Sequence, residues 1–501
     1  MIKYIKGYHT NNYSIDFVCR QYYNCMTYNK GGYSIMPQMF YDDLSWKPQI
    51  NKSEKPIYTA IAGKLEDDIK NSVLKPGDKL PPQRELADFL HVNLTTVTKA
   101  FKLCKRKGLI FATVGKGTFI SSDANISKSF EKESKSGLIE MGTLHPLYGQ
   151  NKLVMESIHK IAQKIAAGDY FEYDEPKMKK RYCEIGSKWM KQFNIRANPK
   201  DIFIASGAQN ALSIILISLF QPGDEIAVDS LTYTGFKNIA NLLGIRLIPI
   251  QISQDGMNSE ALEKACKSEG LKGLYIMPEC QNPTTCTMPF SLRQEIAEIV
   301  KENGLILIED DAYSFLGNTE LPPVSELIPE QSIYISSMSK SLNAGLRVAF
   351  MSVAPKFQDR ICHGIHSINM NTSYFNVEIA ASLIETGLTR QIIEEKRREA
   401  EARNKITDDI LSGFTILGNK RDYFRWLMLP KEWTGKEFEI CAKMSGVQIF
   451  CAERFAVGSN PVPAAVRIAT ASVKSQQELI KGMTILKDLL QNKTDISPLI
   501  I

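Results

Sequence analysis

The sequence predicts an α/β protein whose largest part is built on a mostly parallel sheet. The chain has 501 residues, more than one hydrophobic core usually supports, so about three units are expected at roughly 150 residues each. Hydrophobic residues at 44% and charged residues at 23% are ordinary values for a globular protein. Stretches with helix-like spacing alternate with short apolar runs, a pattern typical of parallel strands joined by helices. These runs lie at residues 202–205, 225–228, 274–277, 305–308 and 333–335.

The chain divides into four predicted segments. Residues 1–54 are rich in Tyr and Asn and lack periodicity, which indicates an extension, and we expect residues 1–38 to be dispensable. Residues 55–121 form a small basic unit, with twelve Lys or Arg against six Asp or Glu. In residues 122–138, serines and charges replace apolar residues, as in a flexible tether. Residues 139–501 form the large domain.

Several classes of protein are excluded. The longest apolar stretch, 212–220, is well short of the roughly 18 residues of a membrane span, and the N-terminus lacks the apolar block of a secretory signal. The ten cysteines form no Cys-x-x-Cys pair, which favours reduced thiols over zinc or disulfides. Cys362, His363 and His366 have no acidic ligand nearby, so no metal is predicted. We expect a cytoplasmic protein.

The basic unit has the spacing of a DNA-binding helix-turn-helix. An apolar stripe from Tyr58 to Ile69 predicts one helix, a second short helix follows Pro82, and Asn93 can cap a third. The second and third helices, joined by a tight turn, make a helix-turn-helix. A strand, a glycine-rich basic turn and a second strand follow, and such a wing suits a minor groove. The residues after the cap that can reach a major groove are Thr95, Thr96, Thr98 and Lys99.

Residues 55–121 resemble the winged-helix domain of the GntR family of transcription regulators. The resemblance lies in KPIYTAI, LKPGDKLPPQRELADFLHVNLTTVTKAF and GLIFATVGKGTFI. It implies that double-stranded DNA is a partner and that Arg84, Lys99 and the wing residue Lys116 contact it. Leu94 and Thr98 stand where the family commonly has basic residues, which leaves the bases that are read open. A winged helix that makes only protein contacts is the alternative.

A second set of residues has the chemistry of a pyridoxal phosphate pocket. Such a pocket needs an amine that forms an imine with the aldehyde, a carboxylate facing the pyridine nitrogen, donors to the phenolate and a cradle for the phosphate. In SIYISSMSKSLNAGLR a predicted strand runs into a serine-rich loop, where Lys340 would form the imine. Ser337, Ser339 and Arg347 would hold phosphate oxygens. A lone lysine in such a loop is more often only solvated, so the assignment of a catalytic role to Lys340 depends on the neighbouring residues.

Those neighbours supply the remaining parts of the pocket. Asp310 ends the buried strand of GLILIEDDAYSF, where ligands bind in α/β sheets, and would keep the pyridinium protonated. Tyr313 and Asn282 would donate to the phenolate oxygen, and Tyr233 would stack on the ring. Ser206 would also bind the cofactor, and the helix that starts after it offers free backbone amides to the phosphate at Gly207, Ala208 and Gln209.

From about residue 139 to 490, the order of these segments resembles the aminotransferases of fold type I that use pyridoxal phosphate. The resemblance implies pyridoxal 5'-phosphate as the cofactor, Lys340 as the catalytic residue and a smaller C-terminal α+β subdomain from about residue 375. It also implies that Arg467 binds a substrate carboxylate and that Tyr173 contacts the phosphate across a dimer.

The sequence departs from that family at positions near the expected substrate. Thr285 and Ala344 replace a glycine and a proline, and Arg421-Asp422 replaces a glycine pair. These departures concern substrate handling more than cofactor binding.

The chain resembles the MocR group of bacterial transcription regulators. It has a GntR-type DNA-binding domain, a linker and an aminotransferase-like domain in the order found in that group. The resemblance implies a homodimer whose effector is pyridoxal phosphate or its imine adduct with an amine or amino acid. Two alternatives stay open. A working aminotransferase with an auxiliary DNA-binding module is compatible with Asn282 and Arg467, although steady turnover is not expected. A structural dimer without cofactor is disfavoured by Lys340, Asp310 and Tyr313.

Overall fold

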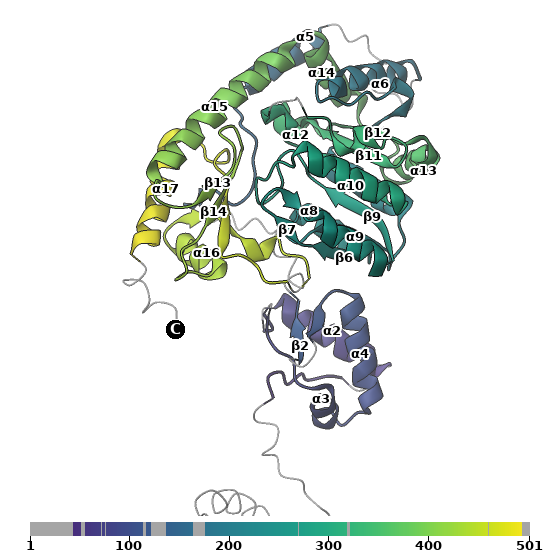
Figure 1. Ribbon diagram of the computed structural model, residues 1–501, viewed down its shortest axis with the longest axis vertical. Helices are drawn as coiled ribbons and strands as arrows, with labels where there is room; N and C mark the ends of the chain where they lie inside the picture. The colour runs from purple at the N-terminus through teal and green to yellow at the C-terminus, as the bar shows by residue number, and fades with distance from the viewer. Residues whose placement is uncertain are drawn as a thin grey trace, which may run out of the picture.

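The computed structural model describes residues 44–51, 56–71, 73–75, 77–113, 117–121, 137–163, 176–268, 270–317, 321–458 and 460–492. Residues 1–38, most of the predicted tether, Lys116 and Tyr173 lie outside the described residues. In Figure 1 the N-terminal unit is purple to blue and the larger part is teal to yellow. Within the described ranges, no helix is long and apolar enough to cross a bilayer.

In the residues that the structure describes, the N-terminal unit has three helices and a β-hairpin. Its elements are α2 (Ile57–Lys70), α3 (Gln83–Phe89), α4 (Leu94–Arg106), β1 (Ile110–Thr113) and β2 (Gly117–Ile120). Ile61 and Leu65 of α2 pack against Val97 and Phe101 of α4, all buried, as the three- and four-residue spacing predicts. The two strands are antiparallel. The predicted helix-turn-helix with a two-stranded wing is therefore present.

Trp46 belongs to the core of this unit, although the sequence analysis assigned it to the extension. The residue is 4% exposed, and its indole N–H donates to Oδ2 of Asp68 at 3.0 Å. The other oxygen of Asp68 accepts from Lys64 at 2.7 Å. A single tryptophan among polar residues produces no periodic signal, so its burial is not visible in the sequence. The core of the N-terminal unit therefore begins before residue 55.

The large domain is built on a seven-stranded sheet in the order β4-β12-β11-β10-β9-β5-β6. Strand β12 is antiparallel to both of its neighbours, and all other pairs are parallel. The prediction of a mostly parallel sheet is confirmed. The strands are β4 (Ile202–Ala205), β5 (Glu225–Asp229), β6 (Arg246–Ile250), β9 (Leu271–Ile276), β10 (Ile306–Asp311), β11 (Ser332–Ser337) and β12 (Ala349–Val353).

Helices cover both faces of this sheet. Their bounds are α5 (Asn151–Ala162), α6 (Pro176–Lys191), α7 (Ala208–Leu219), α8 (Thr234–Leu242), α9 (Ser259–Ser268), α10 (Phe290–Glu302), α11 (Val324–Leu327), α12 (Met338–Ser341), α13 (Gln358–Asn369) and α14 (Tyr374–Glu385). One apolar core includes buried residues of α7, α13 and α14, and a second includes those of α9 and α10. Figure 1 shows α9 and α10 on the face of the sheet toward the viewer.

A smaller unit follows the sheet. Its elements are α15 (Leu388–Ile410), β13 (Ile416–Leu417), β14 (Arg425–Met428), α16 (Gly435–Met444), β15 (Val447–Gln448), β16 (Phe450–Cys451), β17 (Ala465–Ile468) and α17 (Gln476–Gln491). Four strands form an antiparallel sheet in the order β13-β14-β17-β16.

The core of this smaller unit combines segments from both ends of the large domain. Strand β3 (Ile139–Glu140) pairs in parallel with β15, and Ile139 and Met141 are buried with the C-terminal residues. The buried residues of α14 belong to the larger core, whereas Ile406 and Ile410 of α15 pack against the smaller one. The smaller core therefore begins within α15, later than the boundary predicted near residue 375.

Candidate functional site

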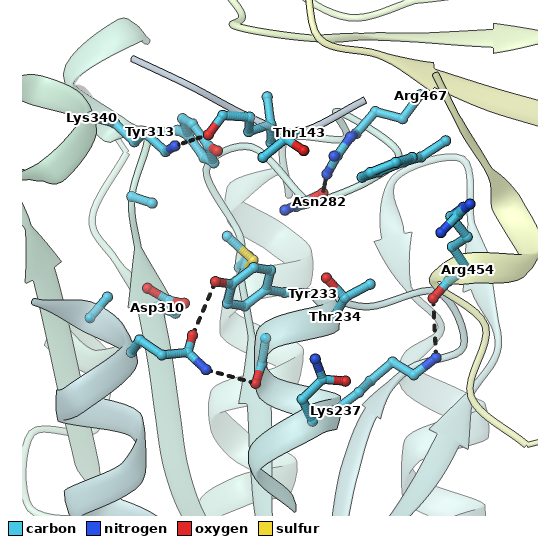
Figure 2. A pocket seen from close by; sticks show the side chains of 18 of the residues that line it. Thr143, Tyr233, Thr234, Lys237, Asn282, Asp310, Tyr313, Lys340, Arg454 and Arg467 are labelled. Atoms are coloured by element: carbon cyan, nitrogen blue, oxygen red, sulfur yellow. Dashed lines mark hydrogen bonds between the residues drawn. The ribbon is translucent and has the colours of Figure 1, made fainter. Parts of the chain in front are cut away.

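A cavity of about 590 Å³ lies where the parallel strands of the large sheet end. Strands β10 and β11 deliver Asp310 and Lys340, and the loop after β9 delivers Asn282. The smaller unit closes the cavity with Arg467 of β17. Figure 2 shows these four side chains around one space. Residues predicted from separate segments thus meet at the edge of the sheet where α/β proteins bind ligands.

Lys340 has the character of a nucleophile. It lies in the short helix α12, directly after β11, and its Nζ donates to the carbonyl oxygen of Leu144. Burial, together with the positive charges of Arg467 and Arg347, lowers the pKa of Lys340 to about 7. A large fraction of the amine is therefore uncharged near neutral pH and able to attack a carbonyl carbon.

Asp310 lies on the floor of the cavity with one oxygen unused. Its Oδ2 accepts the hydroxyl proton of Tyr275 at 3.0 Å, whereas its buried Oδ1 has no partner among the residues that the structure describes. Burial raises the pKa of Asp310 to about 7, and the hydrogen bond from Tyr275 opposes this change. A protonated ring nitrogen would satisfy Oδ1 and stabilise the charged carboxylate. The position therefore fits the pyridine nitrogen of pyridoxal phosphate.

Asn282 and Tyr313, the predicted phenolate donors, both line the cavity. The Oδ1 of Asn282 accepts from Arg467 at 2.6 Å, which leaves Nδ2 as the group that donates. Tyr313 is buried, and its ring contacts Phe424 edge to face with centroids 5.5 Å apart. Burial raises the pKa of Tyr313, so its hydroxyl stays protonated and remains a donor.

Arg347 and the start of α7 form the end of the cavity that suits a phosphate. The guanidinium donates to Oγ of Ser339 at 3.0 Å and to the carbonyl of Ser206 at 3.3 Å. Gly207 has φ +89, and a Cβ there would lie 2.4 Å from Arg347, so only glycine leaves room for the guanidinium. Ser337, at the N-cap of α12, accepts from the amide of Ser339.

One predicted phosphate donor needs correction. The amide of Gly207 donates to the carbonyl of Ala205 at 2.8 Å, because the chain turns tightly between β4 and α7, so this N–H is not free as predicted. The amides of Ala208 and Gln209 lie in the first turn of α7, where helical N–H groups have no partner within the helix. These two remain the predicted backbone donors.

Tyr233 lies at the cavity wall as predicted for a ring contact. Its hydroxyl donates to Oε1 of Gln209 at 3.0 Å, so this residue ties the loop after β5 to the start of α7. Burial raises the pKa of Tyr233 to about 12.

Arg467 is a buried cation without a carboxylate partner in the described part of the chain. It is 4% exposed, and it donates to Asn282 and to the carbonyl of Gly142, each at 2.6 Å. Its Nε has no partner among the described residues, and its guanidinium lies 4.7 Å from the ring centroid of Phe455. Burial lowers the pKa of Arg467 to about 10. A ligand carboxylate would supply the missing negative charge.

The positions that depart from the family pattern lie in ordered turns. Thr285 has φ +66, a left-handed conformation that favours glycine, which accounts for the glycine usual there. Asn343 accepts from the amide of Gly345 at 2.7 Å and thereby caps the turn that contains Ala344. Asp422 accepts from the amide of Asn419 at 2.6 Å.

The predicted DNA-reading surface forms the start of α4. Asn93 accepts from the amide of Thr95 at 3.0 Å, which confirms the predicted cap. Thr95 and Lys99 are exposed, and so is Arg84 on α3. Thr98 is only partly exposed, because its hydroxyl donates to Gln83 at 2.9 Å and joins the two helices. Thr96 is partly exposed, and Lys116 lies outside the described residues.

Some residues that contribute to the site were not predicted from the sequence. Tyr275, which holds Asp310, lies within an apolar strand, and its hydroxyl was the signal that could have revealed it. The carbonyls of Gly142 and Leu144 accept hydrogen bonds from Arg467 and Lys340, but a backbone contact leaves no trace in the side-chain pattern.

Together, the fold and the cavity define a pyridoxal phosphate-binding domain of aminotransferase type, preceded by a DNA-binding winged helix. Comparison with known proteins agrees. The family described as "Aminotransferase class I and II" matches residues 136–480, and "Bacterial regulatory proteins, gntR family" matches residues 57–120.

Two of the relatives are named as transcriptional regulators. HTH-type transcriptional regulator YdeF of Bacillus subtilis (strain 168) is 40% identical over 452 residues, which are 90% of this chain and 98% of the relative. HTH-type pyridoxine biosynthesis transcriptional regulator PdxR of Corynebacterium glutamicum is 25% identical over 365 residues, 70% of this chain and 79% of the relative. The crystal structure of LysN, the alpha-aminoadipate aminotransferase of Thermus thermophilus, shares the fold, with a TM-score of 0.65 and 23% identity over 78% of this chain and 98% of that one.

The chain therefore belongs to the aminotransferase class I and II family over residues 136–480 and is a GntR-type transcription regulator of the MocR kind. Its cofactor is pyridoxal phosphate, as the aminotransferase class I and II family indicates.

Proposed function

We propose that this regulator binds operator DNA and senses pyridoxal phosphate, or the compound that pyridoxal phosphate forms with an amine or amino acid. One observation carries the proposal: a chain with an exposed recognition helix also holds an amine of lowered pKa, Lys340, near the unpartnered oxygen of Asp310. The similarity to PdxR, whose name refers to pyridoxine biosynthesis, supports it.

Each part of the cavity has a separate task in this proposal. Pyridoxal phosphate, when bound, supplies an aldehyde that reacts with amines. Lys340 provides the amine of the chain, and Asp310 holds a proton on the ring nitrogen. Arg347 and Ser339 bind the phosphate, and Arg467 binds the carboxylate of an amino-acid effector. A ligand that binds two conformations unequally shifts the population between them, and this shift would alter DNA affinity.

The decisive experiment maps the genomic DNA bound by the chain in cells with and without pyridoxal phosphate. We expect a defined set of sites whose occupancy depends on the cofactor, and the same sites in a gel-shift titration with the purified chain. The Lys340→Ala variant should bind DNA but lose the response. Equal occupancy of all sites in both conditions would contradict cofactor sensing while leaving DNA binding intact.

A second candidate is a working aminotransferase. It is favoured by the Nε of Arg467, which has no partner in the described part of the chain and is suited to a substrate carboxylate, and by the lowered pKa of Lys340. Catalysis requires Lys340 to act a second time as a base, with geometry held to about half an ångström. Steady turnover of an amino acid with a 2-oxo acid by the full chain, without any change in DNA affinity, would favour the enzyme over the regulator.

The proposal includes a homodimer in the cytoplasm, with Tyr173 contacting the phosphate across the dimer. The resemblance to fold type I aminotransferases supports the dimer, because their active sites use residues of both subunits. Sedimentation equilibrium of the full chain tests this point. A Tyr173→Phe chain that dimerises but binds pyridoxal phosphate more weakly is the expected result.

A further inference from the structure

Lys396, in the middle of α15, is a buried amine outside the set of residues assigned to the cofactor. The residue is 0% exposed. Its Nζ donates to the carbonyl oxygens of Lys340 at 3.0 Å and Leu342 at 2.9 Å. Within the described ranges, no carboxylate forms an ion pair with it. A buried cation without a counter-charge is costly, so this position requires an explanation beyond packing.

The contact fixes the backbone of the residue that carries the reactive amine. Helix α12 has four residues, and the carbonyls at its C-terminal end have no partner within the helix. Lys396 binds two carbonyls at this end, and the hydroxyl of Tyr423 lies 3.5 Å from the same oxygen of Lys340. Since the Lys340 side chain starts from this backbone, its direction into the cavity depends on the contact.

The charge of Lys340 also acts on Lys396 electrostatically. Burial, together with the charge of Lys340, lowers the pKa of Lys396 to about 7. A positive charge on Lys340 therefore disfavours a proton on Lys396. When the charge on Lys340 changes, the strength with which Lys396 holds the carbonyls therefore changes as well.

The same helix contacts two segments that lie next to cavity-lining residues, Tyr313 and Arg467. Arg397 donates to the carbonyl of Phe315 at 2.6 Å, in the turn that follows Tyr313. Further along α15, Arg403 donates to the carbonyl of Thr470 at 3.1 Å, just beyond the strand of Arg467.

Asn404 strengthens the second of these contacts. Its Oδ1 accepts from the hydroxyl of Thr470 at 2.9 Å, and its Nδ2 donates to the carbonyl of Asp422 at 2.7 Å. Helix α15 thus connects the segment of Lys340 with the smaller unit through direct polar contacts.

We propose that Lys396 is a positioning residue that couples Lys340 to α15, so that a reaction at the Lys340 amine changes how α15 holds the segment after Arg467. This inference rests on the proposed function. It adds a structural route, through α15, by which a change at Lys340 affects the smaller unit.

The test compares full-length Lys396→Met and Lys396→Gln with the natural chain. Methionine fills a similar volume without charge or donor, so it removes the cost of burying a charge but leaves two carbonyl oxygens without this donor. Glutamine retains a donor without the charge. Lys405→Met is the matched control, because Lys405 lies on the same helix but is exposed and paired with Asp409.

The first readout is the rate at which pyridoxal phosphate alone forms a borohydride-reducible link to Lys340. For Lys396→Met we expect a rate about ten-fold lower, which corresponds to the loss of about one hydrogen bond from a charged donor. Lys396→Gln should recover part of the rate, and Lys405→Met should match the natural chain. Natural rates in both Lys396 variants would overturn the positioning role.

The second readout is hydrogen exchange of backbone amides, with and without pyridoxal phosphate. In the natural chain, we expect the cofactor to slow exchange at residues 338–342, in α15 and at residues 470–473. In Lys396→Met, the slower exchange at residues 338–342 should persist, whereas the slower exchange in α15 and at residues 470–473 should be lost. If all three persist, the coupling is refuted. If the natural chain shows all three but its DNA affinity ignores the cofactor, the coupling stands and the proposed sensing function fails.

If Lys396→Met does not fold, the linking rate and the hydrogen exchange of Lys396→Gln test the proposal on their own. A natural linking rate together with a natural exchange pattern would then overturn the inference.

Discussion

The hydroxyl of Tyr275 donates to Oδ2 of Asp310 across neighbouring strands of the sheet, at 3.0 Å. The bond fixes the carboxyl group and leaves its other oxygen, Oδ1, without a partner among the described residues. Burial raises the pKa of this carboxyl group. A cation placed at the free oxygen would therefore stabilise the charged form of Asp310. The pair therefore prepares one specific position for a protonated ring nitrogen.

Replacing Asp310 by Asn should weaken the binding of pyridoxal phosphate at least about ten-fold, since one pKa unit of lost interaction corresponds to that factor. The absorption of the bound cofactor should move to shorter wavelength, because the ring nitrogen loses its counter-charge. Tyr275→Phe, which keeps the carboxylate, is the control and should have a smaller effect. An unchanged spectrum in Asp310→Asn would exclude the assigned role.

Replacing Lys340 by Ala should abolish the covalent link, because this side chain supplies the amine. Borohydride treatment followed by peptide mass analysis locates the modified lysine in the natural chain. Lys356→Ala, at an exposed position, should retain the modification. A reducible lysine adduct that survives in Lys340→Ala would show that the assignment is wrong.

The rate of link formation should rise with pH and level off above a midpoint near 7. The sign follows from the amine: it reacts when uncharged, and burial lowers its pKa from 10.5 to about 7. Rapid-mixing absorption measurements across a pH series give the midpoint. Arg467→Met should move this midpoint upward, because a positive charge near the amine is removed. A midpoint close to that of free lysine would contradict the environment described for Lys340.

Lys99→Ala should weaken DNA binding and reduce the slope of log affinity against log salt by roughly one unit, as expected for the loss of one phosphate contact. Lys70→Ala is a suitable control, because Lys70 lies on α2 and pairs with Glu66. Fluorescence anisotropy at several salt concentrations measures both slopes. Equal slopes in the natural chain and Lys99→Ala would remove Lys99 from the interface.

Removal of residues 1–38 should leave DNA binding intact, whereas removal of residues 1–54 should destabilise the N-terminal unit. The second deletion removes Trp46, whose burial and hydrogen bond to Asp68 correspond to a loss of about 2–4 kcal/mol. Denaturant unfolding of both shortened chains, together with the point variant Trp46→Phe, measures the effect. Equal stability of the two shortened chains would show that Trp46 contributes nothing.

The sequence predicted the reactive groups of the cavity because each lies in a local pattern. Asp310 follows a buried apolar strand, and Lys340 follows another strand and a run of serines. Parallel strands place their carboxyl ends at one edge, so proximity follows from order alone. Strand β12 was not predicted. Its apolar residues lie soon after the loop of Arg347, without a helical stretch between, so they do not fit the alternation of helices and strands.

The contacts that hold these groups were less predictable. Lys396 lies 56 residues from Lys340 in the chain, and Tyr275 lies 35 residues from Asp310. Each pair depends on how a helix or strand packs against a neighbour, and one sequence without aligned relatives carries no signal for such a pairing. The amide of Gly207 was assigned wrongly for a related reason, since a tight turn uses a donor that a simple strand-to-helix junction would leave free.

The attachment of the N-terminal part of the chain has a mechanical consequence. The first described strand after the tether, β3, is anchored to β15, and shortly after this strand the carbonyl of Gly142 binds Arg467. A carboxylate arriving at Arg467 competes with that carbonyl for the same guanidinium. Strand β3 thus lies only a few peptide units from the backbone contact of Arg467, and a displacement of Gly142 would act directly on the strand that follows the predicted tether.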